Sequence, residues 1–172
     1  MLRKGIVIAA LCLLPAAAAF GQNTARGPFE LELGGSGANG PNFNGFTAAV
    51  NGSLGYYFND NLEISVRQSL AYSDVAGVSW DASTRVALDY HIPLGDQGQF
   101  QPFFGANIGY VYGQGIHDTF EGAPEAGLKY YVNATTFIYG SVEYQFFFDQ
   151  HSTTSAFSDG QFIYGLGIGF RF

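Results

Sequence analysis

Charged side chains are scarce in this sequence. Only 12% of its 172 residues are Asp, Glu, Lys or Arg, about half the share of an ordinary soluble domain. Long apolar runs are missing as well. After Gly21, no stretch approaches the roughly 20 residues that a membrane-spanning helix needs. These two deficits disfavour both an ordinary soluble domain and a helical membrane protein.

Cysteine occurs once, as Cys12, within an N-terminal stretch that has the features of an export signal. Arg3 and Lys4 form a positive segment, followed by an apolar run and then by small residues. The apolar run is too short for the alternative, a membrane anchor. We therefore predict a cleaved secretory signal peptide over residues 1–21 and one mature domain over residues 22–172.

Several site types lack a signal in the mature chain. It has no cysteine, which excludes disulfides and thiolate chemistry. Loss of Arg3 and Lys4 would change the formal charge from −7 to −9, which argues against nucleic acid as a partner. His91, His117 and Asp118 are too few and too scattered to indicate a metal site. No phosphate-binding glycine loop is present, so we predict neither metal nor cofactor.

Glycine and aromatic residues are abundant, with 24 Gly and 17% aromatics. They follow a period of two, most clearly in the C-terminal stretch Gln161–Phe172. Every second residue there is large and apolar, and the residues between are mostly small or polar. A period of two indicates a β-strand with two unlike faces. The apolar set is Phe162, Tyr164, Leu166, Ile168, Phe170 and Phe172.

The same alternation recurs along the rest of the mature chain. Seven earlier stretches show it: 29–37, 45–58, 62–72, 80–92, 100–112, 120–132 and the segment between the turn 133–136 and the loop 149–160. Strands of this length can cross a hydrocarbon layer when tilted. An even number of antiparallel strands also lets the last pair with the first. We therefore predict an all-β fold, an eight-stranded antiparallel up-and-down transmembrane β-barrel.

Charges and glycines share one face of these strands, and the large apolar residues share the other. A soluble barrel would send its apolar face inward and scatter many charges outside. The scarcity of charge favours the opposite arrangement, with lipid outside and a polar lumen. We expect Arg171 and Glu30 to pair across the closing seam. The polar side carries Glu121 and the predicted lumen network: Glu30, Glu32, Glu63, Arg67, Arg85, Asp89, Glu125, Lys129, Glu143 and Arg171.

Aromatic residues gather towards the strand ends, as expected for two girdles at membrane interfaces. Pro102 and Pro124 each remove a backbone donor, and we expect both to lie near strand ends. One predicted girdle contains Phe29, Tyr56, Phe58, Tyr90, Phe100, Tyr130 and Phe172. The other contains Phe46, Tyr72, Trp80, Tyr110, Tyr112, Phe148 and Phe162.

The interior of an eight-stranded barrel is just wide enough to be filled by side chains. We expect a packed polar lumen, and the alternative is a path for protons or a solute. The surplus of acids over bases requires water, a bound cation or a protonated carboxylate. The inward aromatic residues are Tyr57, Phe103, Tyr131, Tyr139 and Phe147, and the inward glycines are Gly105, Gly109, Gly127, Gly165, Gly167 and Gly169.

Enzymatic signals are weak. The segment 149–152 places an acid, a histidine and a serine together, but neighbours on a loop are not a positioned triad. We therefore predict that the protein is not an enzyme.

Two stretches resemble the small outer-membrane β-barrel proteins of Gram-negative bacteria, of the OmpX, OmpW and OmpA-barrel type. Residues 123–133 and 139–146 resemble their strand-turn-strand unit. Tyr164, Phe170 and Phe172 are similar to the C-terminal signature that this family presents to the barrel assembly machinery. The resemblance implies an outer-membrane location with periplasmic termini and long loops at the cell surface. It also implies contact with outer-membrane lipid and lipopolysaccharide, help from periplasmic chaperones during biogenesis, and a monomer.

The sequence therefore predicts a non-enzymatic outer-membrane barrel with a mostly filled polar lumen, serving envelope structure or integrity or surface interaction. The alternative is a narrow conduit for ions or small apolar molecules. The sequence names no solute and no surface ligand.

Overall fold

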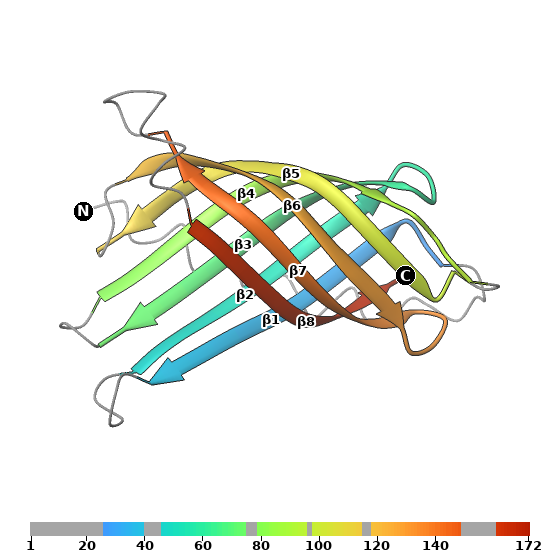
Figure 1. The fold of residues 1–172 in the computed structure, drawn as a ribbon, viewed down its shortest axis with the longest axis horizontal. Coiled ribbons are helices and arrows are strands. Elements are labelled where there is room, and N and C mark those ends of the chain that lie inside the picture. Colours follow the sequence, from blue (N-terminus) through green and yellow to red (C-terminus); the bar gives the residue numbers. More distant parts are fainter. Residues whose placement is uncertain (1–25, 40–45, 75–78, 96–97, 115–117, 149–160) are drawn as a thin grey trace.

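The chain folds into a closed barrel of antiparallel strands (Figure 1). The computed structural model describes residues 26–39, 46–74, 79–95, 98–114, 118–148 and 161–172. Each strand pairs with its neighbours in sequence, and β8 returns to β1. The predicted fold class is confirmed. The strands are β1 Phe29–Asn39, β2 Phe46–Tyr57, β3 Leu62–Ser73, β4 Ser79–His91, β5 Phe100–Gly113, β6 Thr119–Tyr131, β7 Thr136–Phe147 and β8 Gln161–Arg171.

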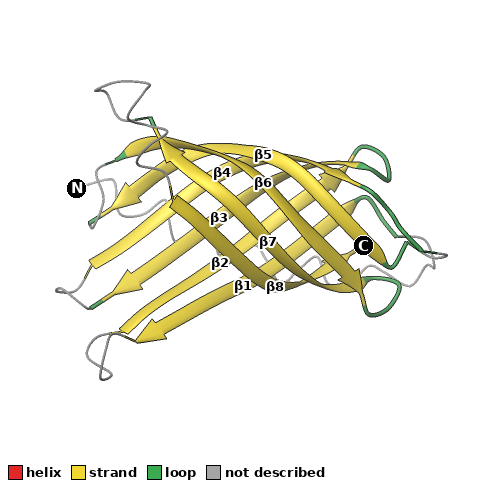
Figure 2. Ribbon diagram, viewed as in Figure 1, coloured by secondary structure: helices red, strands yellow, loops and turns green. Residues whose placement is uncertain are grey.

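Among the described residues there is no helix long and apolar enough to span a membrane. The regular structure drawn in Figure 2 consists of strands.

Two turns at one end of the barrel are built in the same way. The Oδ1 atom of Asn59 accepts hydrogen bonds from the backbone N–H groups of Asn61 and Leu62, both at 2.9 Å. The Oδ1 atom of Asn133 accepts from Thr135 and Thr136 at 2.9 and 2.8 Å. Asparagine side chains that accept from the backbone in this way stabilise tight turns. We call this end the turn end, and the opposite end, where β1 ends and β2 begins, the loop end.

The outer surface of the barrel is apolar on every strand. Val50 and Phe104, for example, are 59% and 55% exposed. A protein dissolved in water buries such side chains, so this exterior suits an apolar surrounding. Aromatic rings pack against one another towards both ends. Phe29 contacts Tyr56 at 5.3 Å between centroids near the turn end, and Tyr144 contacts Phe162 at 4.9 Å near the loop end.

Large side chains fold over glycines inside the barrel. Phe137 on β7 lies opposite Gly169 on β8, and its ring occupies the space that a Cβ at this glycine would need. Phe103 on β5 covers Gly127 on β6 in the same way. Close approach of a ring to a neighbouring backbone requires glycine at the covered position. These glycines therefore admit the aromatic filling of the lumen.

The position of Pro124 differs from the expectation. It lies in the middle of β6, not near a strand end. The ladder between β6 and β7 runs through Gly122↔Phe146 and resumes at Glu125↔Glu143, so that it skips Ala123 and Pro124. Proline has no backbone N–H to donate, which accounts for the interruption. Pro102, by contrast, is near the start of β5, as expected.

The seam between β1 and β8 closes only part of the way. Phe29 and Phe172 exchange two backbone hydrogen bonds, of 3.0 and 2.8 Å. The ladder then runs from Glu30↔Arg171 to Gly34↔Gly167 and ends there within the described residues. Both strands continue, β1 to Asn39 and β8 back to Gln161. Figure 1 shows the start of β8 well apart from the end of β1.

Candidate functional site

The turn-end half of the lumen is organised around Lys129 on β6. Its side chain is 3% exposed and reaches three carboxylates from the opposite wall. The Nζ atom contacts Glu30, lies 3.0 Å from Glu32 Oε1, and lies 3.2 Å from Glu63 Oε2. A buried charge is tolerated when it is paired and hydrogen-bonded. This one ammonium therefore joins β6 to β1 and β3 across the barrel.

Rings and hydrogen bonds close the space around this cluster. The Tyr57 hydroxyl donates to Glu30 Oε2 at 3.0 Å, and His91 Nε2 lies 2.9 Å from Glu63 Oε2. The Lys129 ammonium is 5.0 Å from the Phe137 ring centroid, within the range of a cation–π contact. Phe137 is fully buried but is absent from the inward residues named from the sequence. Phe137 lies two residues before the inward Tyr139 on β7, and this spacing of two could have identified it as an inward residue.

Two arginines seal the turn end. The Arg171 guanidinium stacks over the Tyr57 ring at 3.6 Å, and its Nε donates to the Gly27 carbonyl at 2.9 Å. Arg26 stacks over the Tyr131 ring at 3.7 Å. The expected pair of Arg171 with Glu30 is thus correct in backbone register but wrong in side-chain partner. Glu30 turns to Lys129, and the carboxylate nearest Arg171 is exposed Asp60, at 3.8 Å.

Arg67 on β3 occupies the middle of the lumen. It pairs with Asp89 on β4 and, at 2.5 Å, with Glu125 Oε2 on β6. Its Nε also donates to Ser65 Oγ at 3.1 Å. Asp89 and Glu125 are almost fully buried. One guanidinium therefore serves two acids through separate nitrogens, a geometry that a planar donor fork favours.

Arg85 on β4 forms the next layer towards the loop end. Its Nη1 donates to both oxygens of Glu143 on β7, at 2.6 and 2.8 Å. Asn107 Nδ2 donates to Glu143 Oε2 at 3.0 Å. Glu121 lies 3.8 Å from Arg85 Nε and accepts from Gln145. All members of the predicted lumen network therefore face the interior, in layers along the barrel axis.

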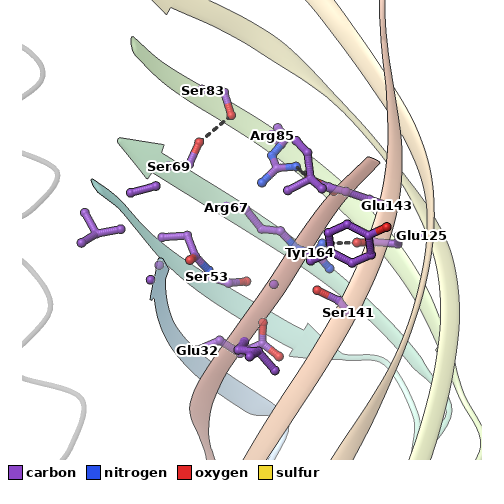
Figure 3. A pocket seen from close by; sticks show the side chains of 18 of the residues that line it. Glu32, Ser53, Arg67, Ser69, Ser83, Arg85, Glu125, Ser141, Glu143 and Tyr164 are labelled. Atoms are coloured by element: carbon purple, nitrogen blue, oxygen red, sulfur yellow. Dashed lines mark hydrogen bonds and ion pairs between the residues drawn. The ribbon is translucent and has the colours of Figure 1, made fainter. Parts of the chain in front are cut away.

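A cavity of about 230 Å³ lies between these layers and the loop end (Figure 3). Arg67 and Arg85 reach into it with their partners Glu125 and Glu143. Small side chains line much of the rest, including Ser53, Ser69, Ser83 and Ser141. The lumen is therefore filled at the turn end and hollow nearer the loop end.

Three residues could offer ligands to a metal. Atoms of Glu63, Asp89 and His91 lie within 4.8 Å of one another, and all three residues are buried. These residues were not grouped from the sequence, because Glu63 meets Asp89 and His91 only through the register between β3 and β4, in which Glu63 pairs with Asp89. Two of their carboxylates are already neutralised, Glu63 by Lys129 and Asp89 by Arg67. The positive charges of the Lys129 and Arg67 side chains therefore disfavour a metal ion at these carboxylates.

Acceptor oxygens exceed donors in the lumen. Within the described residues, one buried side-chain atom that can only donate, Arg85 Nε, has no hydrogen-bond partner in the protein. The buried amide and carboxylate oxygens without a partner are Asp89 Oδ1, Gln101 Oε1, Asn107 Oδ1, Glu121 Oε1 and Glu125 Oε1. Buried acceptors of this kind are normally satisfied by water or a cation. The wall formed by β4, β5 and β6 is therefore suited to water or to other neutral groups that donate hydrogen bonds.

Some predicted residues lie outside the described part of the chain: the signal peptide 1–21, His117 and the loop segment 149–152. Asp118 is described and is exposed. Of the residues assigned to the assembly signature, Tyr164 and Phe170 are exposed on the outer surface, at 74% and 38%. Phe172 stacks on Phe29 at 6.3 Å between ring centroids.

Comparison with solved structures shows which known proteins share this fold. No protein-family model matches the sequence, and no curated protein is significantly similar to it. Solved structures of small outer-membrane barrels do match. The outer membrane protein OprG from Pseudomonas aeruginosa has a TM-score of 0.55 at 14% identity, over 86% of this chain and 97% of OprG.

Two further solved structures of outer-membrane proteins also match this fold. The N-terminal β-barrel domain of Pseudomonas aeruginosa OprF has a TM-score of 0.55 at 19% identity, over 86% of this chain and 99% of that one. Neisserial surface protein A has a TM-score of 0.57 at 12% identity, over 84% and 94%. Identities this low establish a shared fold alone. At that level the resemblance to small outer-membrane barrels is confirmed.

Proposed function

We propose that this protein is a non-enzymatic integral protein of the bacterial outer membrane, whose mostly filled lumen serves envelope structure. The observation that carries the proposal is that the exterior is apolar on every strand, whereas acidic and basic side chains are buried inside. Only an apolar surrounding makes this arrangement favourable. The shared fold with OprG and the OprF barrel domain supports the same location.

The side chains packed in the turn-end half of the barrel support a filled lumen. Lys129 and the carboxylates of Glu30 and Glu32 together span the interior from β6 to β1. Arg26 and Arg171 cover the turn end. A solute would have to break several buried ion pairs to pass, and each broken pair costs several kcal/mol, about 3–5 by analogy with other proteins. The protein is then a structural barrel that can present its loops to partners, as a monomer.

The first test concerns the membrane-spanning barrel. The chain is refolded into phospholipid vesicles and run on a gel in detergent with and without boiling. A closed barrel should migrate differently before and after boiling and should be protected by the vesicles from added protease. Identical migration together with complete digestion would refute the proposed location and fold together.

The second test concerns the lumen, and it separates the filled barrel from a conduit. The cavity of about 230 Å³ is the observation that favours a conduit. Planar bilayers containing the protein should show no single-channel conductance if the lumen is filled. A steady conductance that Arg67→Ala or Glu143→Ala abolishes would replace the filled barrel with an ion path.

Orientation and biogenesis complete the proposal. We place the turn end and the C-terminus in the periplasm and the loop end at the cell surface, facing lipopolysaccharide. Tyr164, Phe170 and Phe172 then form the signal read by the barrel assembly machinery, after escort by periplasmic chaperones. Deletion of Phe172 should strongly lower the amount of assembled barrel in cells, measured by the heat-dependent gel shift. Phe29→Ala, which removes the ring stacked on Phe172, is the matched control for lost packing.

A further inference from the structure

The unpaired part of the β1–β8 seam coincides with the lumen cavity. Gly35 on β1 pairs with Val50 of β2, and Leu166 on β8 pairs with Gly140 of β7. Within the described residues, neither is paired across the seam, where the ladder ends at Gly34↔Gly167. An unpaired strand edge is unfavourable in lipid unless a polar space or a partner satisfies it.

Residues that point to both faces of the wall line the cavity at this position. Its lining contains inward residues such as Asn51 and Ser141. It also contains the outward residues Val50, Tyr164 and Leu166, which are 59%, 74% and 71% exposed. Successive residues of a strand point to opposite faces. A cavity lined from both faces therefore connects the lumen to the outer surface between β1 and β8.

The inner part of this cavity suits an uncharged polar group. Its hydroxyl groups include those of Ser53, Ser69 and Ser141. The charges of both arginines in the lining are already paired, Arg67 with Asp89 and Glu125, and Arg85 with Glu143. The Nε atom of Arg85 has no hydrogen-bond partner among the described residues and can donate to a neutral group. A free anion would meet no unpaired cation there and would be repelled by the carboxylates. Hydroxyl groups can donate to and accept from a neutral head group.

The outer part suits an acyl chain. Gly35 and Gly52 both line the cavity, and in the β1–β2 register they pair with the apolar residues Val50 and Leu33 of the outer belt. The cavity volume of about 230 Å³ is below the roughly 300–1,000 Å³ of pockets that enclose a drug-sized ligand. The lumen therefore holds one end of a ligand, and the rest lies outside.

We propose that the open part of the β1–β8 seam binds a single-chain amphiphile with an uncharged polar head. The head lies in the lumen cavity, and the acyl chain passes between Gly35 and Leu166 to lie on the outer surface. The inference rests on the proposed membrane location, but it adds a ligand site that a purely structural barrel does not need.

The test uses a monoacylglycerol that carries a photoreactive group in its acyl chain. The full chain with Cys12→Ser, and therefore without cysteine, is refolded into phosphatidylcholine vesicles. Cross-links mapped by mass spectrometry should concentrate on residues 163–166 of β8 and 49–53 of β2. Unlabelled monoacylglycerol should compete for these cross-links, and the corresponding fatty acid anion should not.

A disulfide across the seam is the decisive variant. Gly35→Cys with Leu166→Cys continues the β1–β8 register by one pair, and oxidation should abolish the specific cross-links until the disulfide is reduced. Leu33→Cys with Ile168→Cys joins residues that are already paired and is the matched control, expected to label as strongly as the parent. Ile163→Trp, which fills the cavity without a disulfide, should also abolish the specific cross-links.

Several results would overturn the inference. These are labelling spread evenly around the apolar belt, labelling unchanged by the seam disulfide, or equal competition by the fatty acid. A disulfide-linked dimer formed by Leu166→Cys alone would assign the seam to a second copy of the chain instead. The heat-dependent gel shift is recorded first on every sample. Loss of that shift in the parent chain would refute the proposed membrane barrel, and a variant without the shift is not used for labelling. A folded barrel without competed labelling refutes only the ligand site.

Discussion

The two halves of the lumen are built from the same strands but are filled differently. At the turn end, Phe137 is fully buried and Lys129 is surrounded by carboxylates. Nearer the loop end, serines and glycines line a cavity. One β-barrel can therefore have a rigid, filled half and a hollow half, and the difference lies in the inward side chains.

Glycine serves opposite purposes in the two halves. At Gly169 it makes room for the Phe137 ring, which fills the lumen. At Gly165 the nearest atom to an added Cβ is the hydroxyl of Ser141, and the space beyond it belongs to the cavity. The same residue type on the same face of β8 thus permits packing at one position and an empty volume at the other.

The largest expected effect is the loss of Lys129. Lys129→Met would leave Glu30, Glu32 and Glu63 buried without their shared cation, which should lower the free energy of unfolding by about 5 kcal/mol, near the top of the range for breaking buried pairs. Urea unfolding in lipid vesicles, followed by tryptophan fluorescence, measures the change. Ser69→Ala, in the hollow half, is the comparison and should cost no more than about 1 kcal/mol. Equal losses would mean that the halves do not differ.

Truncation of the aromatic filling should come next. Phe137→Ala removes a fully buried ring and should lower the free energy of unfolding by about 3–4 kcal/mol, since a cavity remains. Ile163 borders a cavity that already exists. Ile163→Ala should therefore lower the free energy of unfolding by about 1 kcal/mol or less. The same urea titration compares the two. A larger loss for Ile163→Ala would show that the hollow half carries the stability.

The smallest expected effects come from adding one methyl group. Gly169→Ala would press against the Phe137 ring and should cost about 1–3 kcal/mol through overpacking. Gly165→Ala meets the Ser141 hydroxyl, which can rotate away, so its change should stay within about 0.5 kcal/mol. Thermal unfolding of the refolded barrels gives both values. Similar shifts at the two positions would contradict a difference in packing density.

The sequence pattern was sufficient for the fold because each strand carries its own signal. Alternation over residues 62–72 and 100–112 placed β3 and β5 to within a residue or so of their observed ends. It also placed the charged side chains of the lumen network on the inward face, although it left Phe137 unassigned. Pro124 was misplaced because the apolar alternation continues through it, and a missing donor leaves no trace in a hydropathy pattern.

The ion-pair partners inside the lumen could not be predicted from the sequence. Alternation identifies Lys129 and Glu30 as inward residues but not that they meet, because they come from strands on different sides of the barrel. Their contact depends on the tilt and stagger of the closed barrel, which no local pattern contains. Arg171 is the register partner of Glu30, yet its guanidinium packs on Tyr57. Adjacent strands predict proximity, whereas burial and competing partners decide the ion pair.

The backbone bonds between Phe29 and Phe172 also constrain how the barrel forms. Every other pair of neighbouring strands is consecutive in the chain, but these two residues lie near opposite ends of the described sequence. Local hairpins can form early, whereas a contact of such long sequence separation carries a high loop-closure entropy and forms slowly. Closure of the β1–β8 seam should therefore be the last and slowest step of folding. In the folded barrel, the paired part of this seam extends from Phe29 and Phe172 to Gly34↔Gly167.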